Sequence, residues 1–240
     1  MKKIWVESAF YRVRSTFPVD MIIIHHLGST NGKLFNLNGS ITWLTDKNAH
    51  LNKQTGKLEN IVSAHYIVPR SPYKEHDVIH MVRDENISFH AGTSQWVVDG
   101  KPRSNLNNFS IGIELEGDGN LMEYTDFQYD TLTELTKELM AKFGIPESNI
   151  VGHEDVSPGR KIDPGVMFDW KRYRLGFSKV MAPVCEVLPS VEPAEKEEAI
   201  PTDPEPLPVF MESGEDLPPR KAPVSMPHFL GWLAKLLRIR

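Results

Sequence analysis

Apolar positions in the first three quarters of the chain follow patterns typical of strands and of helices. Residues 21–24 form a continuous apolar and mostly β-branched run, as expected for a central strand that is buried on both faces. Residues 62–68 and 78–82 predict two further strands, joined by a turn over residues 69–74. Residues 109–115 place apolar side chains at every second position, which predicts a fourth strand.

The clearest helix pattern covers residues 126–143. Thr125 and Gln128 have the spacing of a capping box at its start, and Gly144 provides the stop at its end. One apolar stripe runs along this helix and consists of Leu132, Leu135, Leu139 and Phe143. A shorter helix is predicted to begin near Met167. Together these patterns predict an α/β domain with a mixed central β-sheet flanked by helices.

The composition changes after about residue 180. Eleven of the 18 prolines lie between residues 183 and 227, and the same stretch is acidic with few aromatic residues. Such a segment cannot bury enough apolar surface to offset the entropy lost when its backbone is ordered. We therefore expect a folded domain over residues 1–180 and a flexible linker over residues 181–225.

Residues 226–240 predict a short cationic amphipathic helix. Its narrow polar face on a helical wheel consists of His228, Gly231, Lys235 and Arg238. A wide apolar arc with one tryptophan suits a membrane interface, so we expect this helix to contact a membrane surface. The alternative is that its apolar arc docks on the domain or pairs with another copy, because buried protein contacts produce the same periodicity.

Charge and cysteine content narrow the chemistry. The formal net charge of -5 argues against a nucleic-acid-binding protein whose affinity comes from overall positive charge. Cys185 is the only cysteine, which excludes a disulfide framework and an all-thiolate metal site, so any metal must be held by His, Asp or Glu. Residues 1–8 are too polar for a signal-peptide core, so we expect synthesis in the cytoplasm. We also expect the protein to be a monomer.

Candidate metal ligands occur in three places. The predicted strand at residues 21–24 is followed by His25 and His26, the apolar pair at 150–151 is followed shortly by His153, and Asp163 lies ten residues further on. Two imidazoles and one carboxylate form a common zinc site with an open fourth position. Each residue also has a structural interpretation, since buried histidines are often only hydrogen-bonded and an aspartate before proline often shapes a turn. The spacing alone leaves both interpretations open.

Several motifs nevertheless resemble one family. They are Asn-Phe-Ser-Ile-Gly-Ile-Glu-Leu-Glu-Gly at 108–117, Val-Ser-Ala-His at 62–65, Phe-His-Ala-Gly at 89–92, Gly-His through Pro-Gly at 152–165, and Phe-Asp-Trp at 168–170. The chain in this respect resembles the type-2 N-acetylmuramoyl-L-alanine amidases over roughly residues 21–173, in the family's order. That family includes AmpD-type recycling amidases, phage endolysins and peptidoglycan recognition proteins.

The resemblance implies roles for particular residues. His25, His153 and Asp163 would be the ligands of Zn²⁺. Glu114 and Lys161 would be the catalytic pair, with the carboxylate as general base and the cation beside the developing oxyanion. Glu116 is the alternative to Glu114, because it lies two positions further along the same strand face. Substrate-binding residues would be His90, His26 and Asn108; His26 could also exchange roles with His25.

The resemblance implies a zinc-dependent amidase that hydrolyses the bond between the lactyl group of N-acetylmuramic acid and L-alanine in peptidoglycan or muropeptides. Recycling enzymes tend to carry arginines where this chain has Ile61 and roughly Asn105. With the cationic C-terminal helix, this difference favours a phage- or prophage-type endolysin that acts on the cell wall after release. The alternatives are a cytoplasmic amidase that recycles anhydro-muropeptides and a non-catalytic peptidoglycan-binding module.

Overall fold

The structure is a computed structural model that describes residues 1–98 and 100–178. The predicted domain boundary near residue 180, the linker at 181–225 and the helix at 226–240 lie outside the described residues. Among the described helices, none is both long and apolar enough to cross a membrane.

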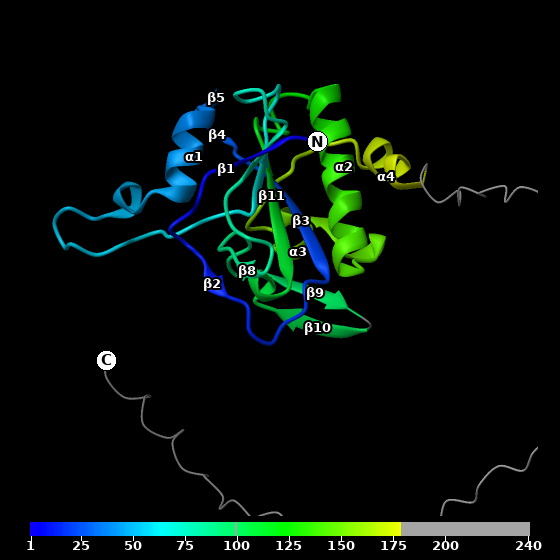
Figure 1. The fold of residues 1–240 in the computed structure, drawn as a ribbon, viewed down its shortest axis with the longest axis horizontal. Coiled ribbons are helices and arrows are strands. Elements are labelled where there is room, and N and C mark those ends of the chain that lie inside the picture. Colours follow the sequence, from blue (N-terminus) through cyan, green and yellow to red (C-terminus); the bar gives the residue numbers. More distant parts are fainter. Residues whose placement is uncertain (99, 179–240) are drawn as a thin grey trace, which may run out of the picture. The chain divides into compact units, whose positions relative to one another are not determined.

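A six-stranded sheet forms the centre of the domain (Figure 1). In spatial order its strands are β1 (Lys3–Trp5), β7 (Val78–His80), β6 (Tyr66–Val68), β11 (Ser110–Leu115), β3 (Met21–His26) and β12 (Ile150–Gly152). The last four of these run parallel to one another, and β6 pairs with β7 in the antiparallel sense. The predicted mixed sheet is therefore confirmed.

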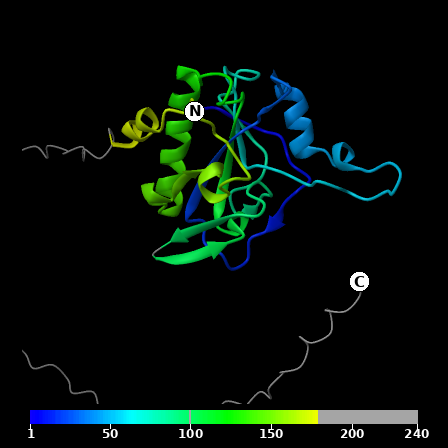
Figure 2. The ribbon, with the colours of Figure 1, turned by 180° about the vertical axis from the view of Figure 1, so that it is seen from behind.

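The central strand β3 is covered on both faces, which explains its continuous apolar run. Ile22 and Ile24 pack in the cluster that contains the leucines of α2 (Asp126–Phe143) and Tyr173 of α4 (Trp170–Ser178). Met21 and Ile23 pack on the opposite face. That face is covered by α1 (Leu37–Thr45) near β6 and β7, by α3 (His153–Val156), and by the hairpin of β9 (Gln95–Val98) and β10 (Lys101–Ser104). The hairpin lies at the lower edge of the domain in both ribbon views (Figure 2).

Helix α2 has the caps that its sequence predicts. The Thr125 side chain accepts the backbone N–H of Gln128, and the Gln128 side chain accepts the backbone N–H of Thr125. Gly144 ends the helix in the left-handed conformation, with φ of 69°, which glycine adopts without a steric penalty. The stripe Leu132, Leu135 and Leu139 is completely buried, and Phe143 packs beside it.

Several predicted boundaries differ from the observed ones. The strand predicted over residues 78–82 ends at His80. The strand predicted from Val62 begins only at Tyr66, because the backbone N–H of Ser63 bonds to Phe89 in a loop rather than to a neighbouring strand. The helix predicted from Met167 begins at Trp170, because the N–H of Met167 donates to the carbonyl of Gly119. The remaining short elements are β2 (Arg12–Val13), β4 (Ser29–Thr30), β5 (Lys33–Leu34), β8 (Asn86–Ile87), η1 (Lys47–His50), η2 (Leu106–Asn108) and η3 (Glu147–Asn149).

Leu135→Ala is expected to lower the free energy of unfolding by about 2–5 kcal/mol, because the truncated side chain leaves a cavity between α2 and the sheet. Urea titration followed by far-UV circular dichroism measures this change. Asp130→Ala is the matched control on the exposed face of the same helix, and a change within about 0.5 kcal/mol is expected for it. Equal losses in both variants would contradict the packing described for α2.

Candidate metal centre

Three parallel strands bring the candidate residues to one edge of the sheet. The register places Glu114 of β11 directly beside His25 of β3, and Gly152 of β12 beside Ile24. His153 follows Gly152 and therefore reaches the level of His25. The carboxyl ends of parallel strands are where such sheets present functional groups. The hydrophobic runs that bury β3 and β12 thus also position the two histidines.

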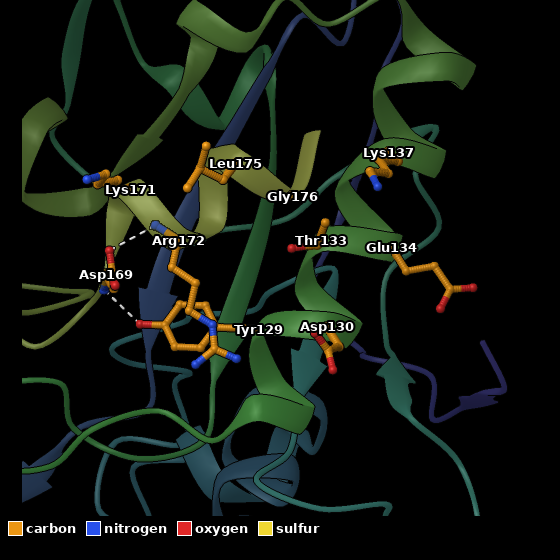
Figure 3. Close-up of a pocket in the computed structure, with 10 residues that line it drawn as sticks. All are labelled: Tyr129, Asp130, Thr133, Glu134, Lys137, Asp169, Lys171, Arg172, Leu175 and Gly176. Atoms are coloured by element: carbon orange, nitrogen blue, oxygen red, sulfur yellow. Dashed lines mark hydrogen bonds between the residues drawn. The ribbon is translucent and has the colours of Figure 1, made fainter. Parts of the chain in front are cut away.

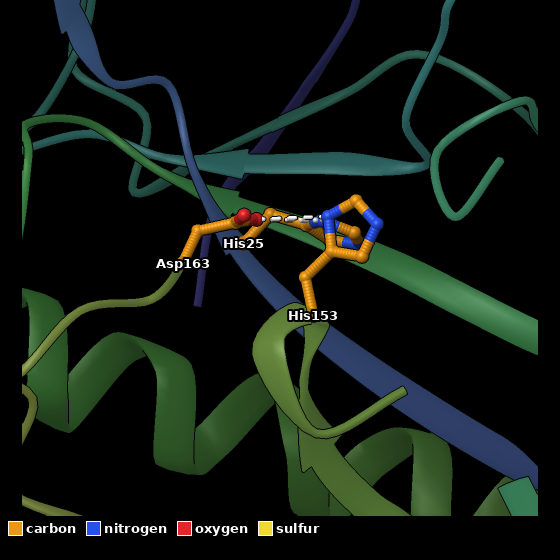
Figure 4. A group of neighbouring side chains, drawn as sticks. All are labelled: His25, His153 and Asp163. Carbon is orange, nitrogen blue, oxygen red and sulfur yellow. Dashed lines mark hydrogen bonds and ion pairs between the residues drawn. The ribbon is translucent and has the colours of Figure 1, made fainter. Parts of the chain in front are cut away.

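His25, His153 and Asp163 converge on one point (Figure 4). The Nδ1 atoms of the two histidines are 2.9 Å apart, and Asp163 Oδ2 lies 3.1 Å from His25 Nδ1 and 3.0 Å from His153 Nδ1. All three residues are buried. Of the predicted metal ligands, the structure therefore brings all three together.

The chemistry of these donor atoms fits a divalent cation. His153 Nε2 lies 3.0 Å from the carbonyl oxygen of Ala91, which can only accept a hydrogen bond, so the neutral form of His153 carries its proton on Nε2 and turns an unprotonated Nδ1 toward Asp163. Two acceptors 3.0 Å apart repel each other unless a positive charge lies between them. Ligands around a tetrahedral cation with bonds of about 2.0–2.1 Å are about 3.3 Å apart, close to the distances observed here.

The loop that carries Asp163 is held against the sheet edge. The Tyr124 hydroxyl donates to the carbonyl oxygen of Pro164 at 2.6 Å. Gly119 packs against the same peptide so closely that a Cβ atom there would lie 2.0 Å from that carbonyl oxygen. Only glycine leaves space for this contact, and the contact places Asp163 next to His25.

His26 lies next to this loop and has a bracing contact. Its Nδ1 atom accepts the backbone N–H of Gly119 at 3.1 Å, and its side chain is largely buried. The structure therefore selects His25, and not His26, for the convergent group. A contact of His26 with substrate stays a prediction.

Glu114 adjoins the metal-ligand group. Its Oε2 atom is buried and has no hydrogen-bond partner among the described residues. Burial raises the pKa of Glu114 well above its ordinary value, the charge of Asp163 raises it further, and Lys161 acts in the opposite direction. A carboxyl group in this setting binds a proton readily, which suits acid–base chemistry. Glu116, the alternative, accepts the backbone N–H of Arg70 at 2.8 Å and is already occupied.

The other two predicted substrate-binding residues lie at different distances from the ligands. His90 is buried and its Nδ1 atom lies 2.9 Å from His25 Nε2, so it belongs to the site. Asn108 precedes β11 and accepts a hydrogen bond from Arg12. Asn108 ends η2, which precedes the amino end of β11, whereas Glu114 lies near the carboxyl end of that strand. A contact of Asn108 with substrate stays a prediction.

Burial holds His25, His65 and His90 neutral. Burial lowers the pKa of His25 to about 4, with a further contribution from His153. It lowers the pKa of His65 to about 3, and that of His90 well below its ordinary value. Burial raises the pKa of Asp163, but its contacts with His153 and His25 outweigh this effect and keep it below the ordinary value. Neutral imidazoles and an ionised carboxylate are the forms that bind metals.

Arg160 is a further residue of the site that the sequence patterns did not identify. Its Nη2 atom donates to the carbonyl oxygens of Ala91 (2.8 Å) and Thr93 (2.7 Å) and to Ser157 Oγ (2.6 Å). These bonds connect the loop before Asp163 to the loop of Ala91 and Thr93, whose Ala91 carbonyl oxygen contacts His153. Its position directly before Lys161 was the only signal in the sequence.

A surface pocket of about 730 Å³ lies elsewhere, between α2 and α4 (Figure 3). Those helices cover the face of the sheet opposite to the side chain of His25. Within the pocket Arg172 lies over the ring of Tyr129 at 4.3 Å and pairs with Asp126 at 2.7 Å. Its guanidinium is thus engaged within the fold, and we place the chemistry at the histidine group instead.

Comparison with known proteins supports this choice. The profile of the N-acetylmuramoyl-L-alanine amidase family matches residues 15–166, which include all three candidate ligands. The 1,6-anhydro-N-acetylmuramyl-L-alanine amidase AmpD of Escherichia coli is 41% identical over 118 residues, which cover 49% of this chain and 60% of that protein. AmpD of Citrobacter freundii is 33% identical over 156 residues, which cover 64% of this chain and 78% of that protein. The match thus spans about 60% of the length of the first of these curated relatives.

Solved structures show the same fold. A crystal structure of AmpD superposes with a TM-score of 0.59 and 32% identity, covering 73% of this chain and 94% of that chain. The amidase AmiD from Escherichia coli, in complex with the substrate anhydro-N-acetylmuramic acid-L-Ala-D-gamma-Glu-L-Lys, gives a TM-score of 0.51 and 27% identity, covering 69% of this chain and 60% of that chain. The predicted fold class is therefore confirmed.

The buried neutral state of His65 predicts a pH effect on stability. An unfolded histidine binds a proton near pH 6.5, whereas folded His65 does so only near pH 3. The unfolded state therefore binds more protons between these values, and the free energy of unfolding falls as the pH falls. In metal-free protein, His65→Gln should reduce this slope between pH 6 and pH 5 by about 1 kcal/mol per pH unit.

Urea titrations at three pH values measure the slope. His76→Gln, in the surface turn before β7, serves as the control for the loss of a histidine side chain. An unchanged slope in His65→Gln would show that His65 is not held neutral in the folded protein.

Proposed function

The chain belongs to the N-acetylmuramoyl-L-alanine amidase family, and from this premise we propose that it is a zinc-dependent amidase. The bond cleaved is the amide between the lactyl group of N-acetylmuramic acid and L-alanine. The observation that carries the proposal is the convergence of His25, His153 and Asp163 directly beside Glu114. This arrangement combines a metal-ligand set with a buried acid–base group, as amide hydrolysis requires.

Zinc is the cation that suits this set of ligands. Two imidazole nitrogens and one carboxylate oxygen form a three-ligand catalytic zinc site, in which the fourth position stays open. When bound there, zinc supplies a Lewis acid that polarises the scissile carbonyl group and lowers the pKa of a water molecule. The chain itself supplies the proton transfers and the positioning.

Glu114 is the proposed acid–base residue. Its carboxylate removes a proton from the attacking water as the new C–O bond forms, and it returns that proton to the L-alanine nitrogen as the C–N bond breaks. The net change is the addition of one water molecule across the amide. The raised pKa of Glu114, caused first by burial, favours a carboxyl group that holds the proton between the two steps.

Lys161 is the proposed electrostatic partner. It lies two residues before Asp163, in the loop held by Arg160 and Tyr124. Its charge lowers the pKa of both Glu114 and His25, which supports an electrostatic role for Lys161 at the site. A fixed cation beside the carbonyl oxygen stabilises the negative charge that develops there in the transition state.

The substrate we propose is a soluble anhydro-muropeptide. The curated relatives at 41% and 33% identity are named 1,6-anhydro-N-acetylmuramyl-L-alanine amidases. AmiD, at 27% identity, has been solved with an anhydro-muramic peptide. These relatives favour the recycling alternative over the endolysin that the sequence patterns led us to expect. The absence of arginine at Ile61 and Asn105 then points to a different set of contacts with the sugar.

Glu114→Gln should lower kcat by about 10²–10⁴, because an amide cannot act as a general base. The bound zinc should stay at one equivalent, since the side chain is not among the ligands. Glu116→Gln is the matched control, because it makes the same change two positions further along the chain. Kinetics on a purified muropeptide, with metal content measured in parallel, decide the assignment. A loss of turnover in Glu116→Gln, with Glu114→Gln unaffected, would reverse the roles of the two residues.

The substrate preference has its own test. The wild-type protein should release stem peptides from soluble anhydro-muropeptides at least ~10-fold faster, in kcat/KM, than from purified sacculi, if about 1.4 kcal/mol of transition-state stabilisation comes from the anhydro sugar. Mass spectrometry of the products also identifies the bond cleaved. Faster release from intact sacculi would support the endolysin, and binding to either substrate without release would support a binding module.

A further inference from the structure

His90 is a buried histidine to which the proposed mechanism assigns no step. Its ring has two polar contacts: Nδ1 lies 2.9 Å from His25 Nε2, and Nε2 lies 3.1 Å from Ser110 Oγ. Both contacts are buried. Because a neutral imidazole has one donor and one acceptor nitrogen, the two contacts must have opposite directions.

The direction is set at the far end of this chain of hydrogen bonds. The Ser110 hydroxyl lies 2.6 Å from the carbonyl oxygen of Leu106 and donates to it, because a carbonyl cannot donate. Ser110 has no second proton, so its oxygen accepts from His90 Nε2. The Nδ1 atom of His90 is then unprotonated and accepts the proton of His25 Nε2. One consistent set of proton positions therefore runs from Leu106 to His25.

This order has a consequence at the metal-ligand group. His25 with its proton on Nε2 has its lone pair on Nδ1, the atom that lies 2.9 Å from His153 Nδ1 and 3.1 Å from Asp163 Oδ2. We propose that His90 is a positioning residue that fixes His25 in the tautomer required for metal binding, through Ser110 and the carbonyl of Leu106. The proposal rests on the proposed function, because it concerns the ligands of the same zinc site.

The backbone next to His90 has the corresponding effect on the second histidine. The carbonyl oxygen of Ala91 accepts the proton of His153 Nε2 at 3.0 Å. Asn107 Oδ1 accepts the backbone N–H groups of both His90 and Ala91, at 3.1 Å and 2.7 Å. The Asn107 side chain thus holds the backbone of His90 and Ala91. These two residues in turn orient the imidazoles of His25 and His153 toward the same point. Outer partners of this kind are known to set the tautomer and orientation of metal-binding histidines.

The fold leaves a space for the His90 ring. A Cβ atom on Gly112 would lie 2.3 Å from His90 Cγ, so only glycine at this position of β11 lets the imidazole lie against the strand. On the far side of that space, His65 Nδ1 accepts the N–H of Gly112 at 3.0 Å and the hydroxyl proton of Ser88 at 2.8 Å. His65 thus forms its hydrogen bonds with other partners and does not compete with His90 for the proton of His25.

The first test is the protonation pattern of the unmodified protein. In the zinc-loaded full chain labelled with ¹⁵N-histidine, long-range ¹H–¹⁵N NMR spectra should show a protonated Nε2 on both His25 and His90, and an unprotonated Nδ1 on His90. The signals are assigned by comparison with the His90→Asn protein. A proton on His90 Nδ1 in the wild-type protein would overturn the proposal.

The second test is zinc affinity, measured by competition with a chelator. His90→Leu removes the acceptor for His25 and should weaken zinc binding by about 10–100-fold. His90→Asn keeps an oxygen near the position of Nδ1 and should restore most of the affinity. If His90 instead contacts substrate, His90→Leu raises KM and leaves the zinc affinity unchanged, which would refute the positioning role.

Ser110→Ala and Ser88→Ala form a matched pair of controls. Each removes one buried hydroxyl that bonds to one histidine, Ser110 to His90 and Ser88 to His65. Ser110→Ala should weaken zinc binding and Ser88→Ala should not. Equal affinities in the two variants would contradict the proposal. A wild-type protein that binds no zinc would instead contradict the proposed function, so the two failures are distinguishable.

Discussion

Three hydrogen-bond acceptors, two imidazole nitrogens and a carboxylate oxygen, meet within 3.1 Å of one another in a buried part of this protein. Acceptors that face each other away from water are costly to bury unless a positive charge compensates them. The rest of the site follows from this constraint. Parallel strands deliver His25 and His153 to the same level, and a loop held by Tyr124 and Gly119 delivers Asp163.

The same constraint explains why so many hydrogen bonds surround the ligands. An imidazole can turn either nitrogen toward a cation, and only its outer contact decides which one is free. Here Ala91 fixes one ring and His90 the other, and Asn107 holds both. The lowered pKa values of His25 and His90 have the same effect, because a protonated ring would repel the cation. The hydrogen bonds, proton positions and charges of these side chains therefore all favour a cation bound at the same point.

Part of this site could be predicted from the sequence. The apolar runs before His25 and His153 show that these residues lie at or directly after the carboxyl ends of buried strands, and the capping residues of α2 define its ends. The function of His90 could not be found in this way, because the direction of a hydrogen bond depends on a partner twenty residues away in the chain. The motif at residues 108–117 runs along the whole of β11, so its first residue, Asn108, and Glu114 lie near opposite ends of that strand. Arg160 acts through backbone carbonyls, which leave no pattern in the sequence.

The most informative measurement is diffraction from crystals of the zinc-loaded protein, recorded at the zinc absorption edge. We expect one anomalous peak about 2.0–2.2 Å from His25 Nδ1, His153 Nδ1 and Asp163 Oδ2. A peak bound through the Nε2 atom of either histidine, or one that does not contact Asp163, would contradict this expectation.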